Sequence, residues 1–163
     1  GGRYQFKDLE HHPLPFNGAA KLPLMIGGVG EKKTLRTVAT YAQGWNAGGN
    51  VETLTHKVDV LKRHCEAVGR DPLEIEFTTN RYLVLRDDPA EADRVLAAGR
   101  ANNGSAHKVD PEIDFLGSEE QVAEQWRQYL ELGFTHVNVD FPSPYDRETM
   151  ERLPRLRELV AGG

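Results

Sequence analysis

Apolar and polar residues alternate along this chain with two different periods. Short apolar or alternating runs predict four strands, at Leu22–Ile26, Gly44–Ala47, Ile75–Leu85 and Phe134–Phe141. Apolar residues spaced by three or four positions predict helices over about 31–43, 50–69, 89–101, 118–133 and 147–160. Because strands and helices follow one another in turn, the pattern predicts an α/β fold whose parallel strands are joined by right-handed crossovers.

Residues at the predicted helix ends support these limits. Asn50 is placed to cap the second helix, and Ser118 with Gln121 forms a capping-box pattern at the start of the fourth. Gly69 is typical of a helix end, and Pro89 fits the first turn of the third helix. The helices therefore have start and stop signals of their own.

Two architectures fit the order of strands and helices: a doubly wound sheet and a (β/α)8 TIM barrel. Four strand-helix units make half of an eight-stranded barrel, and such a half has two sheet edges whose backbone groups lack partners. Residues 1–21 have no sustained periodicity, so we expect an extended connector there. Residues 22–163 then form the folded part.

A cluster of glycines joins the first predicted strand to the first helix. Gly27, Gly28 and Gly30 follow the apolar run directly, and a helix is expected to begin near Glu31. Glycine allows positive φ and close approach of a ligand to the backbone, while the start of a helix presents unpaired N–H groups. The junction is therefore a candidate phosphate site, although a simple tight turn has the same pattern.

Composition excludes several classes of function. Lysine and arginine total 20 and aspartate and glutamate 25, so the formal net charge is −5, and the basic residues are scattered. Binding to nucleic acid is therefore not expected. No apolar stretch approaches the roughly 18 residues of a membrane span, and the start does not resemble a secretory signal. We expect a soluble, cytoplasmic protein that does not associate with membranes.

Potential reactive side chains have structural interpretations that we prefer. Cys65, Trp126 and Tyr129 fall on apolar helix stripes, so we expect them in the core. His56 and His64 lie eight residues apart, about two helical turns, which is too far for joint metal ligation, and no metal site is predicted.

Polar residues on the predicted strands leave the catalytic group unidentified. His136 and Asp140 share one face of the last strand with Asn138 between them, which suits a satisfied polar layer or a solvent-facing surface better than catalysis. Strand ends in a barrel also make Asn80 and Asp87 candidates. None of them is distinguished as the acid or base.

Three segments together resemble the second half of luciferase-like oxidoreductases. They are IGGVGEKKTLRTVATYAQGWN, HCEAVGRDPLEIEFT and FLGSEEQVAEQWRQYLELGFTHVNVDFP, and the opening GGRYQFKDLEHHPLPF is similar to that family's mid-chain connector. The resemblance implies an eight-stranded barrel of which this chain supplies the C-terminal half. It also implies a deazaflavin cofactor, coenzyme F-420, with FMN as the alternative.

The resemblance assigns the cofactor site to the strand ends of this half. The implied cofactor-binding residues are Gly27, Gly28, Val29, Gly30, Glu31, Trp45 and Asn46. The family commonly has Asp where this chain has Gln43, and we expect that difference to affect stability more than activity. The implied activity is oxidation or monooxygenation of a small molecule, and the isolated chain is expected to be inactive.

Two other interpretations stay open at this stage. One is a cofactor-binding or purely structural half-barrel that pairs with a second copy of itself, or with its missing N-terminal half. The other is a doubly wound domain whose glycine turn binds a different phosphate compound.

Overall fold

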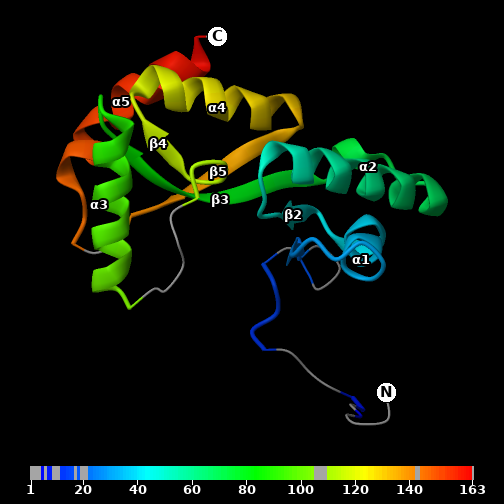
Figure 1. Cartoon of the computed structure of the whole chain (residues 1–163). Helices are drawn as coiled ribbons and strands as arrows, with labels where there is room; N and C mark the ends of the chain where they lie inside the picture. Colours follow the sequence, from blue (N-terminus) through cyan, green and yellow to red (C-terminus); the bar gives the residue numbers. More distant parts are fainter. Residues whose placement is uncertain are drawn as a thin grey trace.

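The computed structural model describes residues 5, 7–8, 12–16, 18, 22–104, 110–141 and 144–162. Within these ranges strands and α-helices alternate along the chain (Figure 1). The strands are β1 (Met25–Gly27), β2 (Gly44–Asn46), β3 (Glu76–Leu85), β4 (Phe115–Gly117) and β5 (Phe134–Asp140). The α-helices are α1 (Thr34–Tyr41), α2 (Val51–Val68), α3 (Pro89–Asn102), α4 (Glu119–Glu131) and α5 (Arg147–Ala161), and a short 3-10 helix, η2, covers Pro72–Glu74. Most of the predicted connector at 1–21 lies outside the described ranges.

All the strand pairs in this sheet are parallel, as predicted. β1 pairs with β2, β2 with β3, and β3 with β5, and the short β4 pairs with the last residues of β3. The strand β3 is the longest because its first half pairs with β2 and its second half with β4. In the described part of the chain, β1, β4 and β5 each pair with a single strand, so the sheet is open at both sides.

The two faces of the sheet differ in chemistry. On one face Trp45, Phe77 and Phe134 are buried in the main core, and their rings contact one another at centroid distances of 5.2 to 5.7 Å. Figure 1 shows α2 and α4 on the same side of β3. On the other face Asn80 and Asn138 are exposed, because strand residues alternate between faces. Further along this face of β3, α3 packs against Tyr82 and Val84.

Several predicted helix signals are confirmed. The Asn50 side chain accepts a hydrogen bond from the N–H of Thr53, and Ser118 forms a complete capping box with Gln121. Gly69 ends α2 with φ of 68°, which favours glycine. Cys65 is fully buried, Tyr129 is 2% exposed, and Trp126 packs against the core, as their positions on apolar stripes predicted.

Two elements differ from the prediction. The helix expected at 31–43 is shorter: residues 31–33 form a turn, and the backbone is extended at Ala42. There the Gln43 side chain accepts a hydrogen bond from the N–H of Leu24 at 2.9 Å, which ties the helix end to the start of β1. The strand β4 lies in residues 115–117, just before the helix predicted at 118–133, and no strand was predicted there because three residues are too few to show a period.

The length and hydropathy of the helices decide whether any of them could cross a membrane. Among the described residues, no helix combines the length with the apolar character needed to cross a membrane.

Candidate functional site

The turn after β1 has the geometry expected of an anion site. Gly28 has φ of 118°, a conformation that favours glycine, and its N–H donates to the carbonyl of Asn46 at 3.0 Å. A Cβ on Gly27 would meet nothing closer than the Asn46 carbonyl at 4.0 Å, so the space beside this residue is open. The turn is thus fixed to the end of β2 and carries no side chain on its open side.

Backbone donors follow the turn. Among the described residues, no group accepts a hydrogen bond from the N–H groups of Val29 through Thr34, while the N–H of Leu35 donates to the Gly30 carbonyl at 3.0 Å. Buried N–H groups normally find partners, and exposed ones bind water or a ligand. A series of such donors beside side-chain-free backbone is the arrangement that binds phosphate at other helix starts.

Trp45 supports this turn from the core. Its indole Nε1 donates to the carbonyl of Gly28 at 2.8 Å, and its side chain is fully buried. The side chain therefore lies behind the turn, on the helix-facing side of the sheet. Its observed role is to hold the turn in place, whereas Asn46, the next residue, lies on the open face.

We expect Trp45→Phe to lower the free energy of unfolding by about 1–3 kcal/mol, because it removes one hydrogen bond and shrinks a packed ring. Backbone amides around Gly28 should also exchange faster. Denaturant unfolding with hydrogen exchange measures both. Tyr41→Phe is the matched control, since Tyr41 is 63% exposed and should change stability by less than about 0.5 kcal/mol. Equal stability of the two variants would contradict the supporting role.

Glu31 is bound to α2 by three contacts. Its carboxylate accepts from Lys57 Nζ at 2.6 Å and lies 3.0 Å from His56 Nε2, and its carbonyl lies 2.8 Å from His64 Nε2. The hydrogen bonds from Lys57 and then His56 hold the pKa of Glu31 below its ordinary value. The two histidines, which sequence spacing had excluded as a metal pair, thus hold the residue that follows the glycine turn.

A row of amides crosses the open face next to the turn. Asn46 Nδ2 donates to Thr78 Oγ1 at 2.8 Å and to Asn80 Oδ1 at 2.9 Å, and Asn138 Nδ2 donates to the same Asn80 oxygen at 3.2 Å. Asn46 pairs with Gly27 across β1 and β2, so the row begins one strand away from the turn. We call Asn46, Asn80 and Asn138 the amide row. These residues lie far apart in the sequence, and strand pairing brings them together.

Other candidates from the sequence lie elsewhere. His136 Nδ1 is 3.5 Å from Glu76 Oε1 on the open face, towards the start of β3. Asp87 binds Arg152 at 2.6 Å, beyond the end of β3. Asp140 is exposed at the end of β5, where the described residues give its carboxylate no partner. No group of three or more metal-ligating residues occurs in the described part of the chain.

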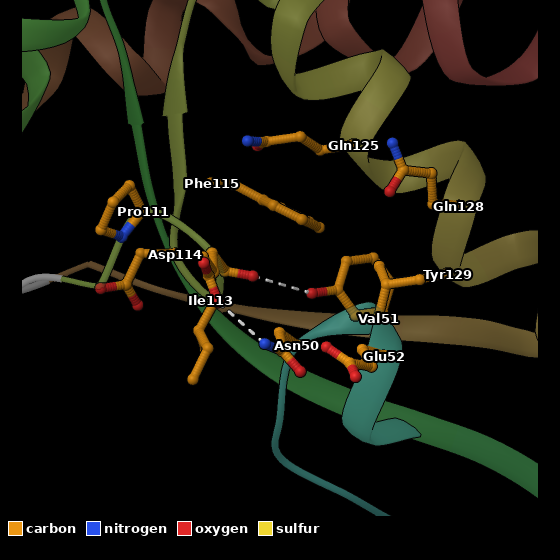
Figure 2. A pocket seen from close by; sticks show the side chains of 11 residues that line it. Asn50, Val51, Glu52, Pro111, Ile113, Asp114, Phe115, Gln125, Gln128 and Tyr129 are labelled. Carbon is orange, nitrogen blue, oxygen red and sulfur yellow. Dashed lines mark hydrogen bonds between the residues drawn. The ribbon is translucent and has the colours of Figure 1, made fainter. Parts of the chain in front are cut away.

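Two hollows lie away from the glycine turn. One, of about 300 Å³, lies between the start of α2, residues 111–115 and α4 (Figure 2). There Asn50 and Tyr129 hydrogen-bond Glu112, and burial raises the pKa of Asp114. The other, of about 750 Å³, is an apolar groove along α5 that Leu83, Trp126 and Val139 help to line. Neither contains a predicted cofactor residue.

Comparisons with known proteins identify the family and the fold of the chain. A family model described as luciferase-like monooxygenase matches residues 1–136. A search of curated proteins found no match. The chain spans about half the length of the solved structures reported next, which are luciferase-like TIM-barrel proteins. The fold class expected from the sequence, half of an α/β barrel, is therefore confirmed.

Three of these structures illustrate the likeness. An F-420-dependent secondary alcohol dehydrogenase in complex with an F-420–acetone adduct is 18% identical, with a TM-score of 0.68 over 86% of this chain and 49% of that one. The EDTA monooxygenase EmoA from Chelativorans sp. BNC1 is 12% identical, with a TM-score of 0.67 over 98% and 50%. Riboflavin lyase with modified FMN and riboflavin is 14% identical, with a TM-score of 0.59 over 82% and 42%.

Proposed function

Because this chain belongs to the luciferase-like monooxygenase family, we propose that it supplies the cofactor phosphate site of an F-420- or FMN-dependent oxidoreductase. The observation that carries the proposal is the series of backbone N–H groups from Val29 to Thr34 without acceptors among the described residues. These groups follow a turn whose open side has no side chain at Gly27. A phosphate group fits such a site because it accepts several hydrogen bonds and carries the negative charge that a helix start favours.

The residues present fit the phosphate end of either cofactor. Gly27 leaves room for close approach, while Gly28 and Gly30 lie against the Thr34 side chain and have no Cβ of their own. Val29 and Glu31 contribute backbone N–H groups, and Trp45 holds the turn from behind. When bound, the deazaflavin or flavin ring supplies hydride transfer, and reduced flavin also activates oxygen. This chain's own contribution is to bind and orient the cofactor, and a second half-barrel is needed to enclose the substrate.

We propose F-420 as the cofactor in preference to FMN. The alcohol dehydrogenase structure has the higher TM-score of the two cofactor-bearing structures above and holds an F-420 adduct, while riboflavin lyase holds modified FMN. Both cofactors carry a phosphate on a ribityl chain, so the glycine turn serves either.

Titration of the chain with F-420, FMN and riboflavin, followed by their fluorescence, tests the proposal. We expect saturable binding of F-420 and FMN, and binding of riboflavin at least 10-fold weaker because it lacks the phosphate. Equal affinity for FMN and riboflavin, or no binding of any of the three, would overturn the phosphate site.

The open sheet edges favour one second candidate. Since β1 and β5 each pair along one edge among the described residues, a second copy of this chain offers the strands needed to close a barrel of paired halves. Size-exclusion chromatography with light scattering separates the candidates. A stable dimer favours self-pairing, whereas a monomer that associates with an added N-terminal half-barrel favours the divided enzyme.

A further inference from the structure

The amide row has a fixed orientation set by its own hydrogen bonds. Asn46 Nδ2 uses both of its hydrogens, one on Thr78 and one on Asn80, and Asn80 Oδ1 accepts from both neighbouring amides. An amide has one carbonyl oxygen and one NH2 group, so each side chain has a defined group left over. Asn46 presents its oxygen, Asn80 its NH2 group, and Asn138 its oxygen with one hydrogen.

These remaining groups face open space. Asn80 and Asn138 are exposed, Asn46 is half-buried, and the described residues provide no partner for Asn46 Oδ1, Asn80 Nδ2 or Asn138 Oδ1. The row thus presents acceptor, donor and acceptor in order across three neighbouring strands. A ligand group that only accepts, such as a carboxylate, leaves the two oxygens unpaired, and an ammonium group leaves the NH2 unpaired. A chain of hydroxyls, each of which donates and accepts, satisfies all three.

The row also lies in line with the glycine turn. Gly27 pairs with Asn46 across β1 and β2, and Asn80 pairs with Asn138 across β3 and β5. Neighbouring strands lie about 4.8 Å apart, so β3 is about 10 Å from β1. A Cβ on Gly27 would meet no side chain within 4 Å, so no side chain lies immediately beside this end of the row. Asn46 is therefore the residue of the row nearest the turn, and Asn80 follows it on the next strand.

We propose that the amide row binds the hydroxyl groups of the polyol chain that joins the cofactor's phosphate to its ring. This inference rests on the proposed phosphate site and adds the class of group recognised beside it. The polyol chain is common to F-420 and FMN, so the row selects phosphorylated sugar-alcohol chains without distinguishing the two rings.

Two small phosphate esters test the proposal. D-ribitol 5-phosphate and pentyl phosphate have the same number of carbons and the same phosphate, but only the first has hydroxyls along the chain. We expect ribitol phosphate to bind at least 10-fold more tightly, as measured by NMR titration of the backbone amides of Gly28 and Gly30. The side-chain NH2 signals of Asn80 should shift with ribitol phosphate and stay in place with pentyl phosphate.

Substitutions in the amide row test whether its side chains cause the preference for ribitol phosphate over pentyl phosphate. Asn80→Ala and, separately, Asn138→Ala should reduce the preference for ribitol phosphate to within about 3-fold while leaving pentyl phosphate affinity unchanged. Glu76→Ala is the control, because Glu76 lies on the same strand and the same exposed face, towards the other end. It should retain the full preference.

The outcomes separate the two proposals. If both esters bind the wild-type chain equally, or if the preference survives in Asn80→Ala, the role of the row is overturned and the phosphate site stands. If neither ester shifts Gly28 or Gly30, the phosphate site itself is overturned, and the row with it.

Discussion

Gly27→Asp is expected to weaken binding of FMN and F-420 by at least 100-fold, which corresponds to about 2.7 kcal/mol. The new carboxylate projects into the space beside the turn, next to a phosphate that carries between one and two negative charges. Two unit charges 4 Å apart at an effective dielectric constant of 20 interact with about 4 kcal/mol, so repulsion of this size is available. Fluorescence titration measures the loss.

Gly27 suits this experiment better than Gly28. A substitution at Gly28 is strained because φ is 118°, whereas Gly27 does not have a positive φ and a Cβ there has room. Gly27→Asn is the matched control, since it has the same shape without the charge, and it should cost less than about 10-fold. Riboflavin affinity should be the same in both variants. Equal FMN affinity in Gly27→Asp and Gly27→Asn would show that no phosphate lies at the turn.

Arg86→Met is expected to lower the free energy of unfolding by about 3–5 kcal/mol, the largest stability effect that we predict. The Arg86 side chain is 8% exposed and donates to both oxygens of Asp146, at 2.9 and 3.0 Å. It also donates to the Leu85 carbonyl, while the Leu85 N–H donates to Thr149. These bonds join the end of β3 to the start of α5, and the substitution leaves Asp146 without its charge partner.

The pH dependence of the free energy of unfolding gives a second test of the Arg86–Asp146 pair. Burial alone raises the pKa of Asp146, but hydrogen bonds from Arg86 and Thr149 outweigh it and hold the pKa below its ordinary value. A lowered folded-state pKa stabilises the fold above the ordinary value near 4, and that stabilisation is lost as pH falls through the folded pKa. In Arg86→Met only the hydrogen bonds from Thr149 still oppose burial, so the pKa of Asp146 rises and the stability difference from wild type should shrink between pH 7 and pH 4.

Two further variants test the explanation. Asp146→Asn added to Arg86→Met should recover part of the loss, because it removes the unpaired charge. Arg94→Met is the surface control, since the Arg94 side chain is 70% exposed and lies 3.8 Å from Asp88, and it should cost less than about 1 kcal/mol. Urea unfolding compares all three. Equal losses in Arg86→Met and Arg94→Met would contradict the role of the buried pair.

Much of the fold was predictable because local signals agree with the tertiary arrangement. The caps at Asn50 and Ser118 and the buried positions of Cys65 and Tyr129 were expected from spacing alone and are confirmed. The strand β4 was missed because three residues show no period, and their pairing with the end of β3 depends on residues about thirty positions away.

The candidate site was only partly predictable. The glycine turn could be found from sequence because glycine has a local conformational role, and its use as a phosphate site stays a prediction. No sequence signal predicted that Trp45 supports the turn. None predicted the contacts of Glu31 with His56, Lys57 and His64 either. These contacts join residues that lie between 17 and 33 positions apart.

By itself the sequence determined the order of strands and helices apart from β4, the parallel sheet and the place of the glycine turn, because periodicity and backbone preference act within a few residues. The tertiary structure alone decided that Asn46, Asn80 and Asn138 form one row beside that turn. It also decided that Trp45 lies behind the turn, with its indole bonded to the Gly28 carbonyl. The physical reason is that strand register sets which side chains meet, and register is fixed by packing across the whole sheet.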